Sequence, residues 1–173
     1  WTAYDIHVTE TSTELKIGYN MKEFAQFSTP LYGRHNISNL TSVVALADFL
    51  GIDKDSIRRA LKTFKGVKRR QEIKGEREGI IVLDDFAHHP TAVKETILAV
   101  REKYAGRRLI AVFEPRSNSS RRNVFQETYV TSFDKADMIF LPEPPLTEKI
   151  PPSERFSSAK LVEDLGRRGL VAN

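Results

Sequence analysis

The first thirty residues alternate between apolar and polar side chains with a period of two. Ile6 and Val8 stand two apart in one segment, and Leu15 and Ile17 do so in the next, with polar breaks between the segments. Successive side chains of a strand point to opposite faces, so this spacing is typical of strands with one buried face. The pattern predicts two or three antiparallel strands within residues 4–30.

The apolar period then changes to that of a helix. Gly51 follows an apolar series at helical spacing, at a position where glycine commonly ends a helix. Asp53 precedes a second, shorter series and belongs to the residue types preferred at the N-cap. We therefore expect two consecutive helices that close a domain. Their predicted apolar positions are Leu40, Val43, Val44, Ala47 and Leu50 in the first helix, and Ile57, Ala60, Leu61 and Phe64 in the second.

A basic, glycine-containing segment, residues 64–75, separates these helices from a part with a different order of elements. We place a domain boundary near residue 66, which gives domains 1–66 and 67–173. Continuous apolar runs now alternate with helical patterns, which is typical of buried parallel strands joined by helices. The fold class is therefore α/β, with a doubly wound, Rossmann-like sheet in the second domain. The expected strands lie in 79–86, 107–115 and 136–144, and the expected helices in 90–104, 119–133 and 158–169.

The sequence "LDDFAHHPT" places two acids and two histidines where the first of these strands meets a helix that begins at Pro90. Asp84 and Asp85 point to opposite faces, so one can bind ribose hydroxyls or a cation while the other caps the helix or pairs with a base. His88 and His89 lie at the positive end of that helix, which favours phosphate. A purely structural interpretation makes His89 an N-cap and leaves the acids solvated.

Two further polar segments are candidates for binding. "EPRSNSSRR" follows the second strand and offers Arg116, Ser117 and Asn118, which suit a carboxylate or phosphate, or which simply begin a basic helix. "GRHNISN" begins the first helix, where Asn36 and Asn39 share a face because they are three residues apart. Carboxamides at that spacing can read the edge of a base. The alternative is that Asn36 caps the helix and Asn39 faces solvent.

Composition narrows the class of partner. The net charge of +4 and the pI of about 9.3 are compatible with a polyanionic ligand, but the basic residues are scattered, which argues against nucleic acid. No apolar run reaches the roughly 18 residues of a membrane helix. The absence of cysteine excludes disulfides and thiolate metal sites, and it is typical of a cytoplasmic protein. Because the chain opens on Trp1 and stops directly after a helical pattern, we expect a fragment of a longer protein.

Taken together, "GRHNISN", "FKGVKRRQE" and "DDFAHHPTAV" resemble the Mur ligase family in order and spacing, across essentially the whole chain. These ATP-dependent ligases build bacterial cell-wall precursors. The resemblance implies the last part of the central ATP-binding domain in residues 1–66 and an incomplete C-terminal Rossmann-like domain in residues 67–173.

Within the family, "GVKRRQE" with "FEPRSN" is most similar to members that join UDP-N-acetylmuramate to L-alanyl-γ-D-glutamyl-meso-diaminopimelate in peptidoglycan recycling. Members that add L-alanine share the "DD-aromatic-x-HHP" signature and rank second. The oligomeric state and the exact amine substrate do not follow from these motifs.

The resemblance also implies cofactors and site residues. The cofactors are ATP and Mg²⁺, with most Mg²⁺ ligands outside this sequence, because no G-x-x-x-x-G-K-[ST] loop is present. We therefore expect the chain by itself to be inactive. The implied nucleotide-binding residues are His35, Asn36, Asn39, Arg70, Asp85 and His88, and the implied peptide-binding residues are Arg116, Ser117 and Asn118.

Two functions of other classes stay open. A non-catalytic nucleotide- or peptide-binding module would be expected to start with its own Met, which Trp1 argues against. A metal-dependent hydrolase would use Asp84, Asp85, His88 and His89, although adjacent ligands on a tight turn rarely converge on one zinc ion.

Overall fold

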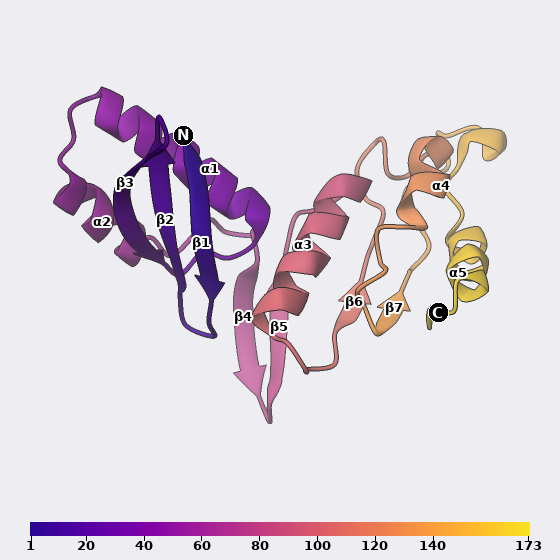
Figure 1. Ribbon diagram of the computed structural model, residues 1–173. Coiled ribbons are helices and arrows are strands. Elements are labelled where there is room, and N and C mark those ends of the chain that lie inside the picture. The colour runs from indigo at the N-terminus through magenta and orange to yellow at the C-terminus, as the bar shows by residue number, and fades with distance from the viewer. The chain divides into compact units, whose positions relative to one another are not determined.

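The computed structural model describes the whole sequence, residues 1–173, and the chain forms two compact units. The first unit comprises residues 1–85 with 102–104, and the second comprises residues 86–101 with 105–173. None of the helices is long and apolar enough to cross a membrane. The elements (Figure 1) are β1 (Thr2–Val8), β2 (Thr13–Tyr19), β3 (Lys22–Thr29), α1 (Arg34–Phe49), α2 (Lys54–Thr63), β4 (Glu72–Arg77), β5 (Ile80–Asp84), α3 (Pro90–Lys103), β6 (Ile110–Val112), η1 (Asn123–Phe125), α4 (Gln126–Tyr129), β7 (Met138–Phe140), η2 (Pro152–Glu154) and α5 (Ser158–Arg167).

The first unit opens with an antiparallel sheet in the order β1-β2-β3, as the alternating pattern predicts. β2 is central, and its residues Leu15 and Ile17 are buried on one face. Asn20 and Met21 join β2 to β3 with positive φ angles of 49° and 63°. Two such residues in a two-residue loop match the twist of the flanking strands.

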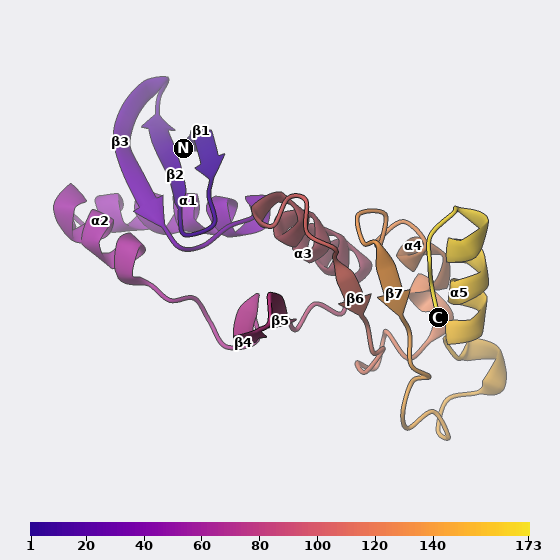
Figure 2. The ribbon, with the colours of Figure 1, turned by 90° about the horizontal axis from the view of Figure 1, so that it is seen from below.

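Helices α1 and α2 pack against this sheet (Figure 2). The predicted end of α1 at Gly51 and the predicted start of α2 at Asp53 are confirmed. Gly51 follows α1 with φ of 76°, and Asp53 caps α2 by accepting from the Ser56 N–H. The predicted apolar faces are only partly right, because Val43, Leu50, Ala60 and Phe64 are exposed. The core consists of Leu15, Ile17, Ala25, Phe27, Ile37, Leu40, Val44, Ile57 and Leu61.

The interpretation of residues 79–86 as a buried parallel strand is wrong. β5 pairs only with β4, in an antiparallel hairpin, and its Ile80 and Val82 side chains are exposed. Glu78 and Gly79 form the turn with φ angles of 52° and 76°, again two residues in the left-handed region. The apolar run concealed this hairpin, because periodicity alone does not reveal the partner of a short apolar strand.

The second unit contains the parallel part of the fold. β6 and β7 pair in parallel, and the segment 171–173 continues the sheet beside β7 through a parallel bridge between Ile139 and Ala172. Helix α3 precedes β6 and α5 follows β7 (Figures 1 and 2), and both contribute buried side chains to the core around Ile139 of β7. This alternation agrees with the α/β class expected from the sequence.

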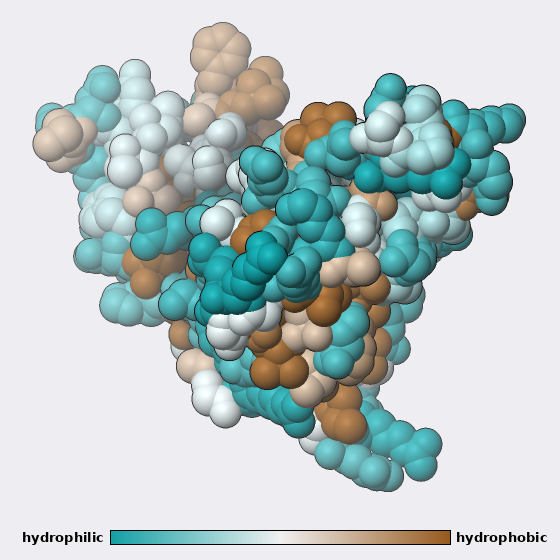
Figure 3. Space-filling view, turned by 90° about the vertical axis from the view of Figure 1, so that its right-hand side faces the viewer, coloured by the Kyte–Doolittle hydropathy of each residue, from teal (hydrophilic) through white to brown (hydrophobic).

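Only one face of the β6–β7 pair is buried. Ile139 is fully buried in a core to which α3 and α5 contribute Val93, Ile97, Leu161 and Leu165. On the opposite face Ile110, Val112 and Phe140 are exposed, so the expectation that both faces of these strands are covered is wrong for this chain. Figure 3 shows that hydrophobic residues, in brown, lie at the surface among hydrophilic ones, in teal, on the side that faces the viewer.

The helix expected in residues 119–133 is also wrong. Only η1 and the single turn α4 are helical there; Tyr129 at the end of α4 and Phe133 in the irregular backbone after it are fully buried. Ser120 is fully buried as well, and its hydroxyl bonds to Ser117. Serine side chains that bond to nearby backbone and hydroxyl groups compete with helix formation, which explains the late start of the helical turn.

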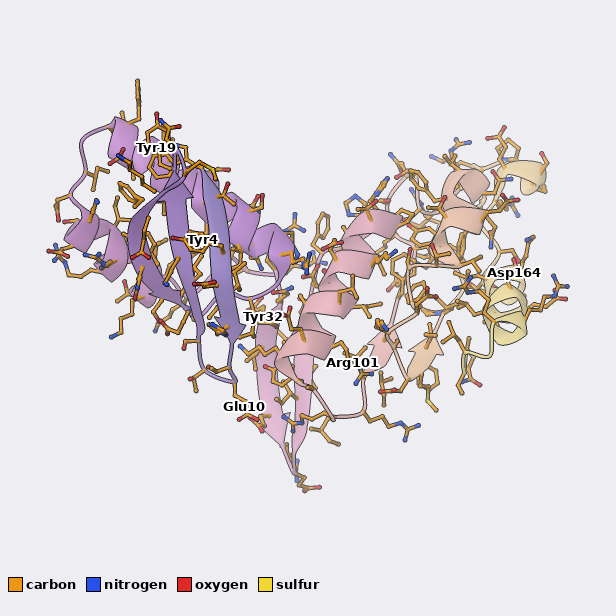
Figure 4. The ribbon with its side chains drawn as sticks, viewed as in Figure 1. Tyr4, Glu10, Tyr19, Tyr32, Arg101 and Asp164 are labelled. Atoms are coloured by element: carbon orange, nitrogen blue, oxygen red, sulfur yellow. The ribbon has the colours of Figure 1, made fainter.

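A polar network joins α3 to the segments that lead into β6 and β7. Arg101, labelled in Figure 4, donates to the carbonyls of Arg107 and Lys135 and forms an ion pair of 2.6 Å with Asp137. Asp137 also accepts from the Leu109 N–H at 2.7 Å. This backbone hydrogen bond, followed by the side-chain hydrogen bond from Arg101, holds the pKa of the Asp137 carboxyl below its usual range.

The network makes the stability of the second unit depend on pH. A depressed carboxyl pKa stabilises the fold above the unfolded value of about 3.9, and this contribution disappears as the pH falls through the lower folded pKa. Asp137→Asn should therefore lower the thermal unfolding midpoint at pH 7 but leave it close to wild type in strong acid. Asp134→Asn is the control, since its exposed pair with Arg168 should contribute little. A pH-independent difference for Asp137→Asn would contradict this account.

Candidate functional site

In the first unit, the start of α1 directs one carboxamide back toward the preceding loop. Gly33 is the N-cap, with φ of 87° and no side-chain cap, so Asn36 does not cap the helix. Instead the Asn36 Nδ2 donates to the Tyr32 carbonyl at 2.9 Å and to the Gln71 Oε1 at 3.1 Å. Both Nδ2 hydrogens are thereby used, and the group that Asn36 has left to offer is the acceptor Oδ1.

Gln71 joins Asn36 to the acidic end of β5. Its backbone N–H donates to the Asp85 Oδ2 at 2.9 Å, while its side chain accepts from Asn36. The residue has φ of 50° and is only 9% exposed, and its Nε2 is buried without a hydrogen-bond partner. A non-glycine residue held in the left-handed region indicates that the surrounding structure fixes its conformation. Sequence analysis missed Gln71, since no local pattern marks it.

The neighbouring acid has a separate partner, as the opposite strand faces predict. The Asp84 Oδ2 lies 3.6 Å from the Arg69 Nε. The Arg69 N–H donates to the Glu72 carboxylate at 2.8 Å, and this backbone hydrogen bond is the main reason that the pKa of Glu72 lies below its usual range. The two acids therefore anchor the same loop at two residues, Asp84 at Arg69 and Asp85 at Gln71.

A cavity of about 460 Å³ adjoins this network. Its wall includes Arg70, Gln71 and Glu72, and it also carries the lysines Lys65, Lys68 and Lys103. This excess of cations suits an anionic ligand such as a phosphate.

Two polar atoms at the start of α1 are buried without a hydrogen-bond partner, the Tyr32 hydroxyl and the His35 Nδ1. Burial is the main reason that the pKa of Tyr32 (labelled in Figure 4) lies far above its usual range. Asn39, the other predicted reader of a base, is exposed on α1. Unsatisfied buried groups near a cationic cavity are typical of a binding site.

In the second unit, the two histidines have structural partners. The His88 Nδ1 lies 3.0 Å from the Phe86 carbonyl, and the His89 Nδ1 accepts from the Thr91 N–H at 3.3 Å. The Tyr129 hydroxyl donates to the His88 carbonyl, and the His89 ring packs against the edge of Phe125, with ring centres 4.7 Å apart. The interpretation of His89 as an N-cap-like residue before α3 is confirmed.

The loop after β6 is held by its own hydrogen bonds. The Ser117 hydroxyl bonds to Ser120 at 2.8 Å, and the Asn118 Oδ1 accepts from Arg121 at 2.7 Å. Arg116 projects into solvent and pairs with Glu114 at 3.3 Å. Of the three predicted peptide-binding side chains, Arg116 is therefore the most accessible.

No group of three His, Asp or Glu side chains in residues 1–173 lies close enough to hold a metal ion. The side chains of Asp84 and Asp85 are bound to different residues, and His88 and His89 bond to backbone groups of their own turn.

Comparison with known proteins gives consistent relatives. Residues 69–171 match the family model described as Mur ligase, glutamate ligase domain. A UDP-N-acetylmuramate–L-alanine ligase of Streptococcus gordonii is 36% identical over 141 residues, 82% of this chain and 31% of the relative. The corresponding ligase of Desulforapulum autotrophicum is 41% identical over 140 residues, 80% of this chain and 30% of the relative. The chain thus spans about a third of the length of these relatives.

Solved structures agree on the fold. The UDP-N-acetylmuramate–alanine ligase of Thermotoga maritima superposes with a TM-score of 0.80 at 22% identity, over 98% of this chain and 36% of that one. A murein peptide ligase of Psychrobacter arcticus superposes with a TM-score of 0.58 at 28% identity, over 99% of this chain and 35% of that one.

The contact from Tyr129 to the turn before α3 can be tested directly. Tyr129 is fully buried, so Tyr129→Phe should leave the His88 carbonyl without its donor and cost about 1–2 kcal/mol of unfolding free energy. Amide hydrogen exchange in residues 86–91 should also become faster. Tyr19→Phe is the control, because Tyr19 is 48% exposed. Equal effects of the two substitutions would show that the hydrogen bond does not stabilise the turn.

Proposed function

The chain belongs to the Mur ligase family, and from that premise we propose that it forms part of an ATP-dependent ligase that makes an amide bond to UDP-N-acetylmuramate. The observation that carries the proposal is the network from Asn36 through Gln71 to Asp85 beside the cationic cavity. It brings together residues that are far apart in the sequence and that suit a nucleoside triphosphate.

We assign the proposed roles from the position and chemistry of each side chain. The Asn36 Oδ1 accepts from the adenine amine, with Asn39 and His35 beside it. Asp85, whose carboxylate also accepts from the Gln71 backbone N–H, is assigned to the ribose hydroxyls. Arg70 lines the cationic cavity and is assigned to the phosphates or ribose. His88 is assigned to the wall of the nucleotide site, close to Asp85 in sequence.

The proposed reaction has two steps. The lactyl carboxylate of UDP-N-acetylmuramate attacks the γ-phosphorus of ATP, and ADP leaves as an acyl phosphate forms. The amine of the second substrate then attacks the acyl carbon, and the tetrahedral intermediate expels inorganic phosphate as the nitrogen loses a proton. Phosphoryl transfer depends mainly on positioning and charge neutralisation, which the cations around the cavity would provide.

Mg²⁺ belongs to this chemistry, but the residues of this chain do not fit it. Because no three acidic or histidine side chains converge, we assign no metal ligand here.

The domain limits 1–66 and 67–173 also stay part of the proposal. The compact units divide after Asp85, whereas the family match begins at residue 69.

For the amine we propose L-alanine, which reverses the order expected from the sequence motifs. The support is that the curated relatives at 36% and 41% identity are named as L-alanine ligases. The tripeptide L-alanyl-γ-D-glutamyl-meso-diaminopimelate is the second candidate. It is favoured by the 28% identity to a murein peptide ligase and by the accessible Arg116 in "EPRSN", a cation suited to a peptide carboxylate.

Substrate choice by the full-length ligase that contains this chain distinguishes the two candidates. UDP-N-acetylmuramate and ATP with Mg²⁺ would be offered either L-alanine or the tripeptide, and phosphate release would be followed. We expect release with L-alanine. Release with the tripeptide alone would assign the enzyme to peptidoglycan recycling, and Arg116→Ala should then raise the KM for the tripeptide. Release with neither amine would overturn the proposed function.

The chain by itself should neither hydrolyse ATP nor ligate, because no phosphate loop is present in its sequence. A coupled assay of ADP formation would check this, with the full-length ligase at equal concentration as the positive control. Turnover by residues 1–173 that survives repurification would contradict the expectation.

A further inference from the structure

Gln71 occupies a position that the proposed reaction does not explain. It contacts Asn36 and Asp85, yet its own Nε2 is buried without a partner. A carboxamide that leaves a buried donor unsatisfied does not owe its presence to stability alone, because an apolar side chain of similar length would avoid that cost. The useful group is therefore the other half of the amide, the Oε1 that accepts from Asn36.

The Oε1 determines what Asn36 can read. A free asparagine amide presents an acceptor on one side and a donor on the other, so it can bind either an amine or a carbonyl. Here one Nδ2 hydrogen goes to the Tyr32 carbonyl and the other to Gln71. Only the acceptor Oδ1 is left. It can accept a hydrogen bond from the amine of a 6-aminopurine, whereas the oxygen of a 6-oxopurine is itself an acceptor and would be repelled.

We propose that Gln71 is a positioning residue that makes the Asn36 amide selective for adenine over 6-oxopurines. The inference rests on the proposed function, because it assumes that Asn36 faces the base. Gln71 acts through Asn36 and needs no contact with the nucleotide. Its removal releases one Asn36 N–H, which then becomes available to the carbonyl of a 6-oxopurine.

The geometry separates this role from the contact with Asp85. Gln71 binds Asp85 through its backbone N–H, which every replacement except proline retains. Gln71→Met keeps the length of the side chain and the unbranched Cβ suited to φ of 50°, while removing both the acceptor and the unsatisfied donor. Gln71→Glu keeps an acceptor for Asn36. These two variants therefore differ in the one interaction that the proposal concerns.

The test measures Kd for ATP and for inosine triphosphate, with Mg²⁺ present, by calorimetry on the full-length ligase. Wild type should prefer ATP. In Gln71→Met the ratio of the Kd for inosine triphosphate to the Kd for ATP should fall by roughly tenfold, which corresponds to about one hydrogen bond. In Gln71→Glu the ratio should be retained even though the added negative charge weakens both nucleotides. Asn36→Ala should abolish the preference, and Gln26→Met, at an exposed position of β3, should not change it.

The outcomes distinguish a failed inference from a failed function. Equal weakening of both nucleotides in Gln71→Met, with the ratio unchanged, would make Gln71 merely structural and overturn the inference while the proposed function stands. A wild-type ligase that binds no ATP, or that does not prefer ATP, would overturn both. Loss of the ratio in Gln71→Glu as well as in Gln71→Met would also count against the role of the acceptor.

Discussion

The hydrogen bond from the Gln71 backbone to the Asp85 carboxylate fixes the geometry on which the candidate site depends. It lies one residue beyond the pair of Glu72 and Asp84, at the open end of the β4–β5 hairpin. The hairpin holds the two chain segments in register, and Asp84 secures the same loop through Arg69. Because the donor is a main-chain N–H, every side chain except proline at residue 71 retains this anchor.

From this anchor the site extends to α1 through side chains alone. Asn36 is half-buried, and its two donors are committed to Tyr32 and Gln71, so the helix start presents an acceptor of fixed orientation. The adjoining cavity supplies positive charge from Lys65, Lys68 and Arg70. The groups proposed to recognise a base and to attract an anion thus come from different segments, which the fold of the first unit brings together.

The second unit shows a different balance. Its core is completed on one side of the β6–β7 pair, where Ile139 meets residues of α3 and α5, while Ile110 and Val112 remain exposed. The turn before α3 is held by the hydrogen bond from the Tyr129 hydroxyl and by the cap that His89 provides. Of the polar loops that the motifs singled out, the one after β6 is largely self-bonded, and Arg116 is the group that it leaves accessible.

The sequence by itself determined the elements whose signals are local. The antiparallel strands of residues 2–29, the ends of α1 and α2, and Pro90 at the start of α3 follow from periodicity, capping residues and glycine, all of which act within a few residues. The family followed from motifs of the same short range. Only the tertiary structure decided that β5 pairs with β4 and that Gln71 meets Asn36, 35 residues away in the sequence. The physical reason is that a short apolar run can pair with several strands, and a carboxamide can bond to many donors and acceptors. Long-range packing selects one partner for each.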